Sequence, residues 1–96
     1  MEFADRGTAD VYNGVDSKQA RNTLPRDLWH VAQRKLDMLA AATNLGDVVV
    51  PRGNNLEKLK GELAGFHSIR INEKYRIVFT WEDGRGAADV RIVDYH

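Results

Sequence analysis

Three stretches near the end of the chain alternate between apolar and polar residues. They span residues 66–71, 75–81 and 88–93, and each has the period of two that a β-strand with one solvated face requires. Polar, turn-forming residues separate the stretches at Asn72-Glu73-Lys74 and at Asp83-Gly84-Arg85-Gly86. Because short connections of this kind join neighbouring antiparallel strands, the pattern predicts a three-stranded antiparallel meander.

The same alternation assigns side chains to the two faces of the predicted sheet. One face receives the apolar residues Ile69, Ile71, Tyr75, Ile77, Phe79, Trp81, Val90 and Ile92. The opposite face receives Arg70, Arg76, Arg91 and Tyr95. The apolar face needs a cover, and the opposite face is expected to be a cationic surface exposed to solvent.

The segment from Leu24 to Ala42 has the clearest helical pattern in the chain. Pro25 suits the first turn of a helix, and Thr23 just before it is a candidate N-terminal cap. Apolar residues recur at spacings of three and four, at Leu28, Val31, Ala32, Leu36, Leu39 and Ala42. This stripe is the natural cover for the apolar face of the sheet.

The other segments give weaker signals. Residues 8–14 have a capping threonine and a terminal glycine, which indicate a short helix, and residues 15–23 read as a loop or as the start of the next helix. Residues 1–3 are a candidate edge strand, and a β-branched run at residues 48–50 ends where residues 51–55 break it. Helices followed by a run of strands predict an α+β fold, with an antiparallel sheet covered on one face by N-terminal helices.

Composition narrows the class of protein. The 96 residues are expected to form one domain, spanning 1–96, with one apolar core. Basic and acidic residues number 14 each, so a net charge of zero argues against long-range attraction to nucleic acid but allows a local basic patch. The absence of cysteine fits a reducing cytoplasm. No apolar run approaches the roughly 20 residues of a membrane span, and residues 1–6 lack the pattern of a signal peptide.

An ordered set of short motifs runs from residue 56 to the end of the chain. The set comprises Leu56-Glu57-Lys58-Leu59-Lys60-Gly61, Gly65, Ser68-Ile69-Arg70-Ile71-Asn72, Tyr75-Arg76-Ile77-Val78-Phe79 and Val93-Asp94-Tyr95-His96. In this order the motifs resemble the HigB toxins, the plasmid-maintenance killer branch of the RelE/ParE superfamily. Some relatives carry histidine where this chain has Glu57, and the segment 16–23 looks longer than in compact members.

The resemblance implies a RelE-like fold and the toxin of a type II toxin-antitoxin system. The implied activity is that of a ribosome-dependent mRNA endoribonuclease that needs no metal or cofactor, inhibits translation and arrests growth in the cytoplasm. The implied partners are the 70S ribosome, mRNA and a helix-turn-helix antitoxin of the HigA type. The resemblance also allows a toxin–antitoxin heterotetramer that binds operator DNA through the antitoxin, with no role for a membrane.

Metal-free cleavage of RNA needs a base for the 2′-hydroxyl, cations for the phosphorane and an acid for the leaving 5′-oxygen. On the resemblance, the candidate catalytic residues are Lys60, Arg76, Asp94, Tyr95 and His96, and the candidate RNA- or phosphate-binding residues are Lys58, Arg70 and Arg91. The alternation of side chains along the strands independently supports Arg70, Arg76 and Tyr95, because it places all three on one face of the sheet. The choice of Lys60 and His96 rests mainly on the resemblance. Which residue acts as the general base stays open.

Each candidate also has an ordinary structural explanation. A lysine before a glycine in a turn is usually solvated, and an arginine on a sheet face is usually solvated or paired across strands. A terminal histidine is usually a disordered end, and Tyr95 could equally serve packing. His30, His67 and the aromatic residues are better explained by packing than by catalysis.

Two alternative functions share the expected fold. A ParE-like toxin would poison DNA gyrase without cleaving anything, and an inactive module would act only as co-repressor with its antitoxin. A nuclease needs acid–base residues beside the cationic patch, and Asp94-Tyr95-His96 is such a set. The nuclease is therefore the leading hypothesis.

Overall fold

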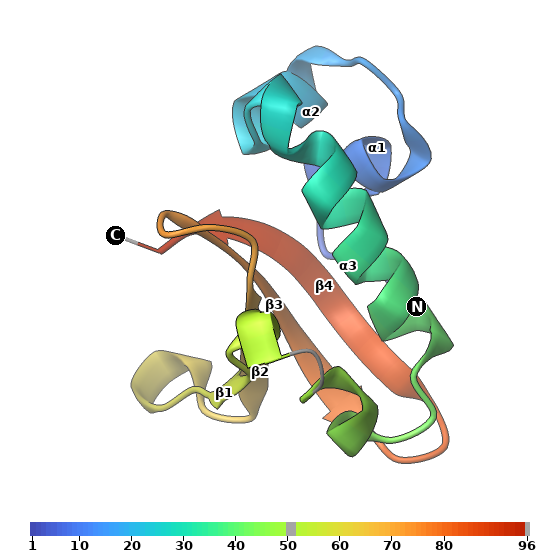
Figure 1. Cartoon of the computed structure of the whole chain (residues 1–96), viewed down its shortest axis with the longest axis vertical. Helices are drawn as coiled ribbons and strands as arrows, with labels where there is room; N and C mark the ends of the chain where they lie inside the picture. The colour runs from blue at the N-terminus through green and yellow to red at the C-terminus, as the bar shows by residue number, and fades with distance from the viewer. Residues whose placement is uncertain (50–51, 96) are drawn as a thin grey trace.

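The computed structural model describes residues 1–49 and 52–95, and its α-helices lie on one side of an antiparallel sheet (Figure 1). The helical elements are α1 (Arg6–Asn13), α2 (Lys18–Thr23), η1 (Arg26–Leu28), α3 (Trp29–Ala41), η2 (Leu45–Val48), η3 (Arg52–Asn54) and η4 (Gly61–Leu63). The strands are β1 (Glu57–Lys58), β2 (Phe66–Arg70), β3 (Tyr75–Glu82) and β4 (Gly86–Asp94), in the sheet order β1-β2-β3-β4. The α+β fold and the C-terminal meander are therefore confirmed, with β1 as an additional short edge strand.

The register of the sheet confirms the predicted faces. Ile69 pairs with Ile77, which pairs with Ile92, and all three are buried beneath the helices. α3 runs along β4 on this face (Figure 1), and its buried residues Ala32, Leu36 and Leu39 join the same apolar core. Period-two strands and a helical stripe therefore meet as the sequence predicts.

One irregularity in β4 interrupts the alternation. Val78 pairs with Arg91, whereas Thr80 pairs with Ala88, so β4 carries one extra residue between these pairs. Asp89 within this bulge has a left-handed φ of 49°. As a result Ala87 and Val90, three positions apart, are both buried in the core.

The N-terminal helices differ from the prediction in where they begin. α1 begins at Arg6 because Asp5, rather than Thr8, is the cap, and its carboxylate accepts a hydrogen bond from the Thr8 N–H at 2.7 Å. Gly14 ends α1 as predicted, with a φ of 72°. Residues 18–23 form the separate helix α2, so Thr23 ends one helix instead of capping the next.

The long predicted helix loses its first turn because Leu24 is extended, which places a bend before η1 and moves the start of α3 to Trp29. The Trp29 indole N–H donates to the Leu24 carbonyl at 2.8 Å, which fixes this bend. The β-branched run at residues 48–50 begins inside η2, which ends at Val48, and Val50 lies outside the described residues.

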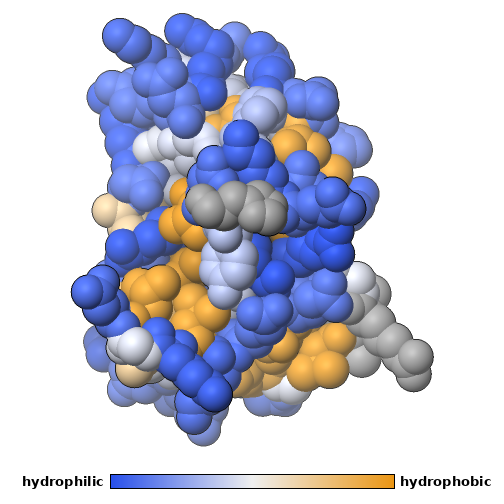
Figure 2. All heavy atoms as spheres, turned by 90° about the vertical axis from the view of Figure 1, so that its left-hand side faces the viewer, coloured by the Kyte–Doolittle hydropathy of each residue, from blue (hydrophilic) through white to orange (hydrophobic). Residues whose placement is uncertain are grey.

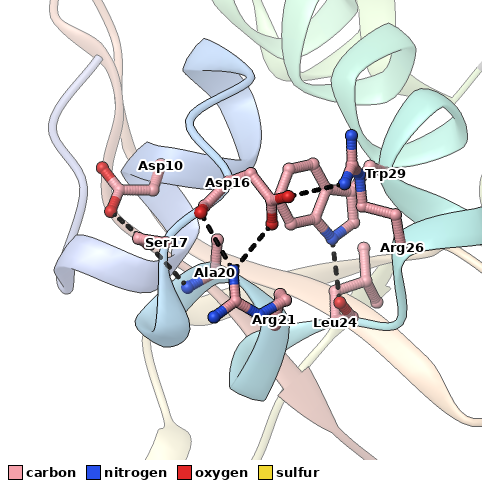
Figure 3. Close-up of polar contacts among 8 residues, drawn as sticks. All are labelled: Asp10, Asp16, Ser17, Ala20, Arg21, Leu24, Arg26 and Trp29. Carbon is pink, nitrogen blue, oxygen red and sulfur yellow. Dashed lines mark hydrogen bonds and ion pairs between the residues drawn. The ribbon is translucent and has the colours of Figure 1, made fainter.

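A small polar group joins the α1–α2 connection to the start of α3 (Figure 3). The Asp16 carboxylate accepts hydrogen bonds from Arg21 at 3.0 Å and from Arg26 at 2.7 Å. The bond from Arg21, together with the charges of Arg26 and Arg21, holds the pKa of Asp16 below its usual value. The Arg26 guanidinium also lies 4.9 Å from the centre of the Trp29 ring. The group thus holds residues 16–26 against the beginning of α3, at the surface.

The outer edge of β4 is covered by the beginning of the chain. Phe3 forms a single parallel bridge with Val90, supported by hydrogen bonds between Ala4 N and Val90 O and between Val90 N and Glu2 O. The candidate edge strand at residues 1–3 is therefore this one bridge. Farther along the edge, the Ile92 N–H donates to the buried Thr8 hydroxyl at 3.0 Å. A side chain of α1 thus satisfies a strand donor that has no strand beside it.

We expect Thr8→Val to lower the free energy of unfolding by about 1–3 kcal/mol, because the buried Ile92 N–H loses its acceptor while the side chain keeps its shape. Thr8→Ser is the matched control, since it keeps the hydroxyl and loses one methyl group, which costs about 1 kcal/mol. Urea unfolding of the three proteins measures both values. Equal stability of Thr8→Val and wild type would show that this bond does not hold α1 to β4.

Candidate functional site

Arg76 is the centre of the polar face of the sheet, and it is buried rather than solvent-exposed as expected from the sequence. Its side chain is only 9% exposed. One terminal nitrogen donates to the Asn55 carbonyl and lies 3.5 Å from the Ser68 carbonyl, and the other lies 3.5 Å from the Glu57 carboxylate. A buried guanidinium needs such partners, and they come from the chain just before β1, from β1 and from β2. The backbone at Asn55 turns there through a left-handed φ of 46°.

Tyr95 covers another side of the same guanidinium. The Arg76 Cζ atom lies 5.3 Å from the centre of the Tyr95 ring, within the range of a cation–π contact. The Tyr95 N–H donates to the Lys74 carbonyl at 2.7 Å, which ties the end of the chain to the turn between β2 and β3. Tyr95 is 44% exposed, so its ring and hydroxyl remain open to a ligand.

These residues line one shallow pocket with a volume of about 370 Å³, which we call the Arg76 pocket. Its lining consists of Asn55, Glu57, Arg70, Asn72, Glu73, Arg76 and Tyr95. Two guanidiniums, two carboxylates, two amides and one phenol therefore face a common space. The side of the molecule that carries β1 and the end of the chain is mostly hydrophilic, with separate hydrophobic areas between (Figure 2). Such a surface suits a polar, charged ligand better than an apolar one.

Of the residues proposed from the sequence, the structure brings Arg70, Arg76 and Tyr95 together in this pocket. These are the three residues that the alternation of side chains along the strands assigns to one face. Arg91 leaves β4 on the same face, where it pairs with Val78 and lies 5.3 Å from the Phe66 ring, but it does not line the pocket.

Lys58, Lys60 and Asp94 lie outside the Arg76 pocket. Lys58 is in register with His67, one position along from the Glu57–Ser68 pair, so its side chain leaves the sheet on the face opposite Glu57. Lys60 is an exposed residue just before η4 and does not line the pocket. Asp94 pairs with Tyr75, and its carboxylate lies 3.6 Å from Lys74 on the face opposite Arg76. His96 lies outside the described residues.

Several residues of the site had not been proposed from the sequence. Glu57 was visible only as a departure from relatives with histidine, and the contribution of Asn55 is a backbone carbonyl, for which a sequence carries no signal. The neighbouring Asn54 is fully buried, and its amide donates to the Val48 carbonyl at 3.1 Å and accepts from Lys35 at 3.0 Å. Asn54 thus fixes the position of the next residue, Asn55, whose carbonyl accepts a hydrogen bond from Arg76.

The charges around the site influence one another. Burial lowers the pKa of the Lys35 ammonium, and the guanidiniums of Arg34, Arg70 and Arg76 lower it further. Within residues 1–49 and 52–95, no three His, Asp or Glu side chains gather in a way that could hold a metal ion. No helix in that part of the chain is long and apolar enough to cross a membrane. The guanidiniums that line the Arg76 pocket can bind an anion, and its carboxylates and phenol are groups that can donate or accept protons.

The fold recurs in a solved structure, the YoeB–YefM complex from Staphylococcus aureus. A chain of that complex matches 99% of this chain over 93% of its own length, with a TM-score of 0.55 and 22% sequence identity. At this identity the likeness concerns the fold alone. It shows the class of the fold, an antiparallel sheet covered by helices on one face.

Sequence comparisons place the chain more closely. All residues from 1 to 96 match the HigB-like toxin family, described as the RelE-like toxin of the type II toxin-antitoxin system HigB. Toxin HigB-1 of Vibrio cholerae serotype O1 is 39% identical over 84 residues, 88% of this chain and 85% of the relative. An uncharacterized protein of Haemophilus influenzae is 38% identical over 73 residues, 76% of this chain and 72% of the relative. The chain therefore belongs to the HigB-like toxin family.

We expect Arg76→Lys to lower the free energy of unfolding by about 1.5–3 kcal/mol, because a lysine cannot contact both the Asn55 carbonyl and the Glu57 carboxylate through planar, paired donors. Arg91→Lys, on the same face but outside the pocket, is the matched control and should change stability by less than about 0.5 kcal/mol. Chemical unfolding of both variants gives the comparison. Equal effects at the two positions would mean that burial of Arg76 does not stabilise the fold.

Proposed function

We propose that this toxin is an endoribonuclease that cleaves mRNA on the translating ribosome, with the Arg76 pocket as its active site. The observation that carries the proposal is the arrangement at Arg76, where one buried guanidinium lies between a carboxylate and an exposed tyrosine ring. A phosphodiester anion can bind to Arg70 through paired donors and is attracted by the charge of Arg76 beside it, while acid–base groups flank it. Family membership supports the role of a toxin, and the pocket supports the nuclease chemistry.

In the proposed reaction the Glu57 carboxylate takes the proton of a ribose 2′-hydroxyl, and the 2′-oxygen attacks the adjacent phosphorus. The bond from phosphorus to the 5′-oxygen then breaks, which leaves a 2′,3′-cyclic phosphate. Arg76 and Arg70 stabilise the charge that develops on the phosphorane. The leaving 5′-oxygen accepts a proton from the end of the chain, where Tyr95 and His96 are the candidates. The reaction uses only protons and the groups named, without a metal or an oxidant.

The shape of the pocket fits dependence on the ribosome. The pocket is shallow and holds its main cation in contacts with Glu57 and Asn55, so it does not by itself orient a flexible RNA strand. An mRNA held in the decoding site arrives already oriented, and orientation alone can lower a barrier by several kcal/mol. We therefore propose that the ribosome supplies the geometry and the toxin supplies the charges.

The proposed protein partner is a helix-turn-helix antitoxin of the HigA type. The structural relative from Staphylococcus aureus is itself part of a complex, the YoeB–YefM complex. Expression of this chain alone should arrest growth, and co-expression of the adjacent open reading frame should restore it. Normal growth at high expression of the folded chain would count against its role as a toxin and against the proposed antitoxin partner.

Glu57→Gln tests the base. We expect cleavage of mRNA on programmed ribosomes to slow by about 10²–10⁴-fold, the usual contribution of a general base. Glu82→Gln is the matched control, because Glu82 is an exposed glutamate paired with Arg85 at the far end of β3. The rate is measured in single turnover by primer extension. Full activity of Glu57→Gln would show that Glu57 is not the general base. Tyr95 and His96 at the end of the chain would then be the candidates for that role.

Removal of Tyr95 and His96 separates the nuclease from its alternatives. The deletion removes residues beyond β4, including the ring that covers one side of Arg76, so we expect a modest fall in melting temperature and a loss of cleavage. Tyr95→Phe keeps the ring against Arg76 and should retain more activity than the deletion. A gyrase-poisoning toxin would cleave no mRNA in either form. A deleted protein that cuts at the same positions as the parent would refute the role assigned to the chain end.

A further inference from the structure

Lys35 of α3 is a half-buried cation that forms no ion pair with an acidic group among the described residues. Its ammonium donates to the Asn54 side-chain oxygen at 3.0 Å, and Asn54 is itself fully buried and fixed to the Val48 carbonyl. Among the described residues, no carboxylate lies within ion-pair distance of Lys35, Arg34 or Arg70. The lysine is thus held in place by a neutral amide, and its positive charge remains available to a ligand.

A pocket of about 430 Å³ opens beside this lysine, and we call it the Lys35 pocket. It is lined by Arg34, Lys35, Met38, Gly53 and Asn54. Two cations therefore lie beside an apolar methionine side chain. Apart from Gly53 and its two neighbours in the chain, no heavy atom of the described residues lies within 4 Å of the position that a Cβ atom on Gly53 would occupy. Cations beside an apolar wall suit a nucleotide, whose phosphate is charged and whose base and sugar present flat apolar surface.

The Lys35 pocket is adjacent to the Arg76 pocket through two consecutive residues. Asn54 accepts the hydrogen bond from Lys35, and Asn55 accepts the hydrogen bond from Arg76. The two groups of cations also repel one another, because Arg70 and Arg76 both contribute to the lowered pKa of Lys35. A chain of anions that spans both pockets would relieve this repulsion, and an RNA backbone is such a chain.

We propose that the Lys35 pocket binds a second phosphate of the RNA, next to the phosphate that is cleaved in the Arg76 pocket. Arg34 and Lys35 contact this phosphate, and Met38 packs against the attached nucleoside. The proposal rests on the proposed function and adds a subsite to it. An acidic peptide could also meet two cations, but the continuity with the Arg76 pocket favours a polymer with regularly repeated phosphates.

The test measures binding and not cleavage. Short 2′-O-methyl oligoribonucleotides, which cannot form the 2′-oxyanion, are titrated with the folded protein over a range of salt concentrations. Each phosphate contact with single-stranded nucleic acid contributes about 0.7 to the slope of log K against log salt. We expect Lys35→Met to reduce the slope by about this amount and to weaken binding several-fold at low salt. Lys18→Met, which changes an exposed lysine of α2, should leave both values unchanged.

Two further variants separate the charge of the subsite from its structural role. Lys35→Met also removes the partner of Asn54, so its melting temperature is measured in parallel. Arg34→Gln changes an exposed residue with no ion pair among the described residues, and it should reduce the slope without a change in melting. A single methylphosphonate linkage, neutral in charge, is then moved along the oligonucleotide. When the neutral linkage stands beside the central phosphate, it should weaken binding to the wild-type protein. The same linkage should not weaken binding to Arg34→Gln any further.

Unchanged slopes for Arg34→Gln and a folded Lys35→Met would overturn the proposal. Loss of antitoxin binding without loss of RNA binding in these variants would also overturn it, because the pocket would then serve an acidic protein segment. The outcomes separate this subsite from the proposed function. If the wild-type protein cleaves mRNA but the variants have unchanged slopes, only the subsite is refuted. If the wild-type protein does not cleave mRNA but the variants have reduced slopes, the nuclease is refuted and the RNA-binding subsite stands.

Discussion

The burial of the Arg76 guanidinium is the constraint on which the polar face of this protein depends. A side chain that is 9% exposed and permanently charged must be surrounded by acceptors, since the cost of an unpaired buried charge is several kcal/mol. The acceptors come from two parts of the chain, namely the Asn55 carbonyl and the Glu57 carboxylate at the beginning of β1, and the Ser68 carbonyl in β2. The Tyr95 ring completes the enclosure. The residues that stabilise Arg76 are therefore largely the residues that form the pocket.

This double role links stability to function. The segment before β1 is irregular, and it is held by a buried asparagine that reaches both the end of η2 and α3. Because the same segment presents Asn55 and Glu57 to Arg76, a change in the helix layer can alter the pocket on the other face of the sheet. The helices that cover the apolar core thus also determine where the cationic centre lies.

The sequence was sufficient for the sheet and its faces, because alternation with a period of two is a local signal that the buried core enforces. It did not reveal the bulge at Asp89, since one extra residue in β4 leaves the flanking alternation intact on each side. It placed the start of the long helix too early, because the extended backbone of Leu24 depends on a hydrogen bond from Trp29.

For the site, the alternation of side chains along the strands correctly placed Arg70, Arg76 and Tyr95 on one face, and all three line one pocket. It could not show that Arg76 is buried, because Asn55 and Glu57, which cover it, come from a distant part of the chain. Glu57 and Lys35 were missed as well. Their positions follow from contacts between residues about 20 apart in the chain, and no periodicity reports such contacts.

The most direct test of the central claim is a structure of the protein bound to a ribosome whose decoding site holds an mRNA with a 2′-O-methyl group at the cleavage position. If Arg76 organises the active site, the phosphate beside the modified ribose will lie between Arg70 and Arg76, with Glu57 near the methylated oxygen and Tyr95 against the nucleotide. An mRNA that contacts the toxin only outside this pocket, with Arg76 still enclosed by Glu57 and Asn55, would contradict the account.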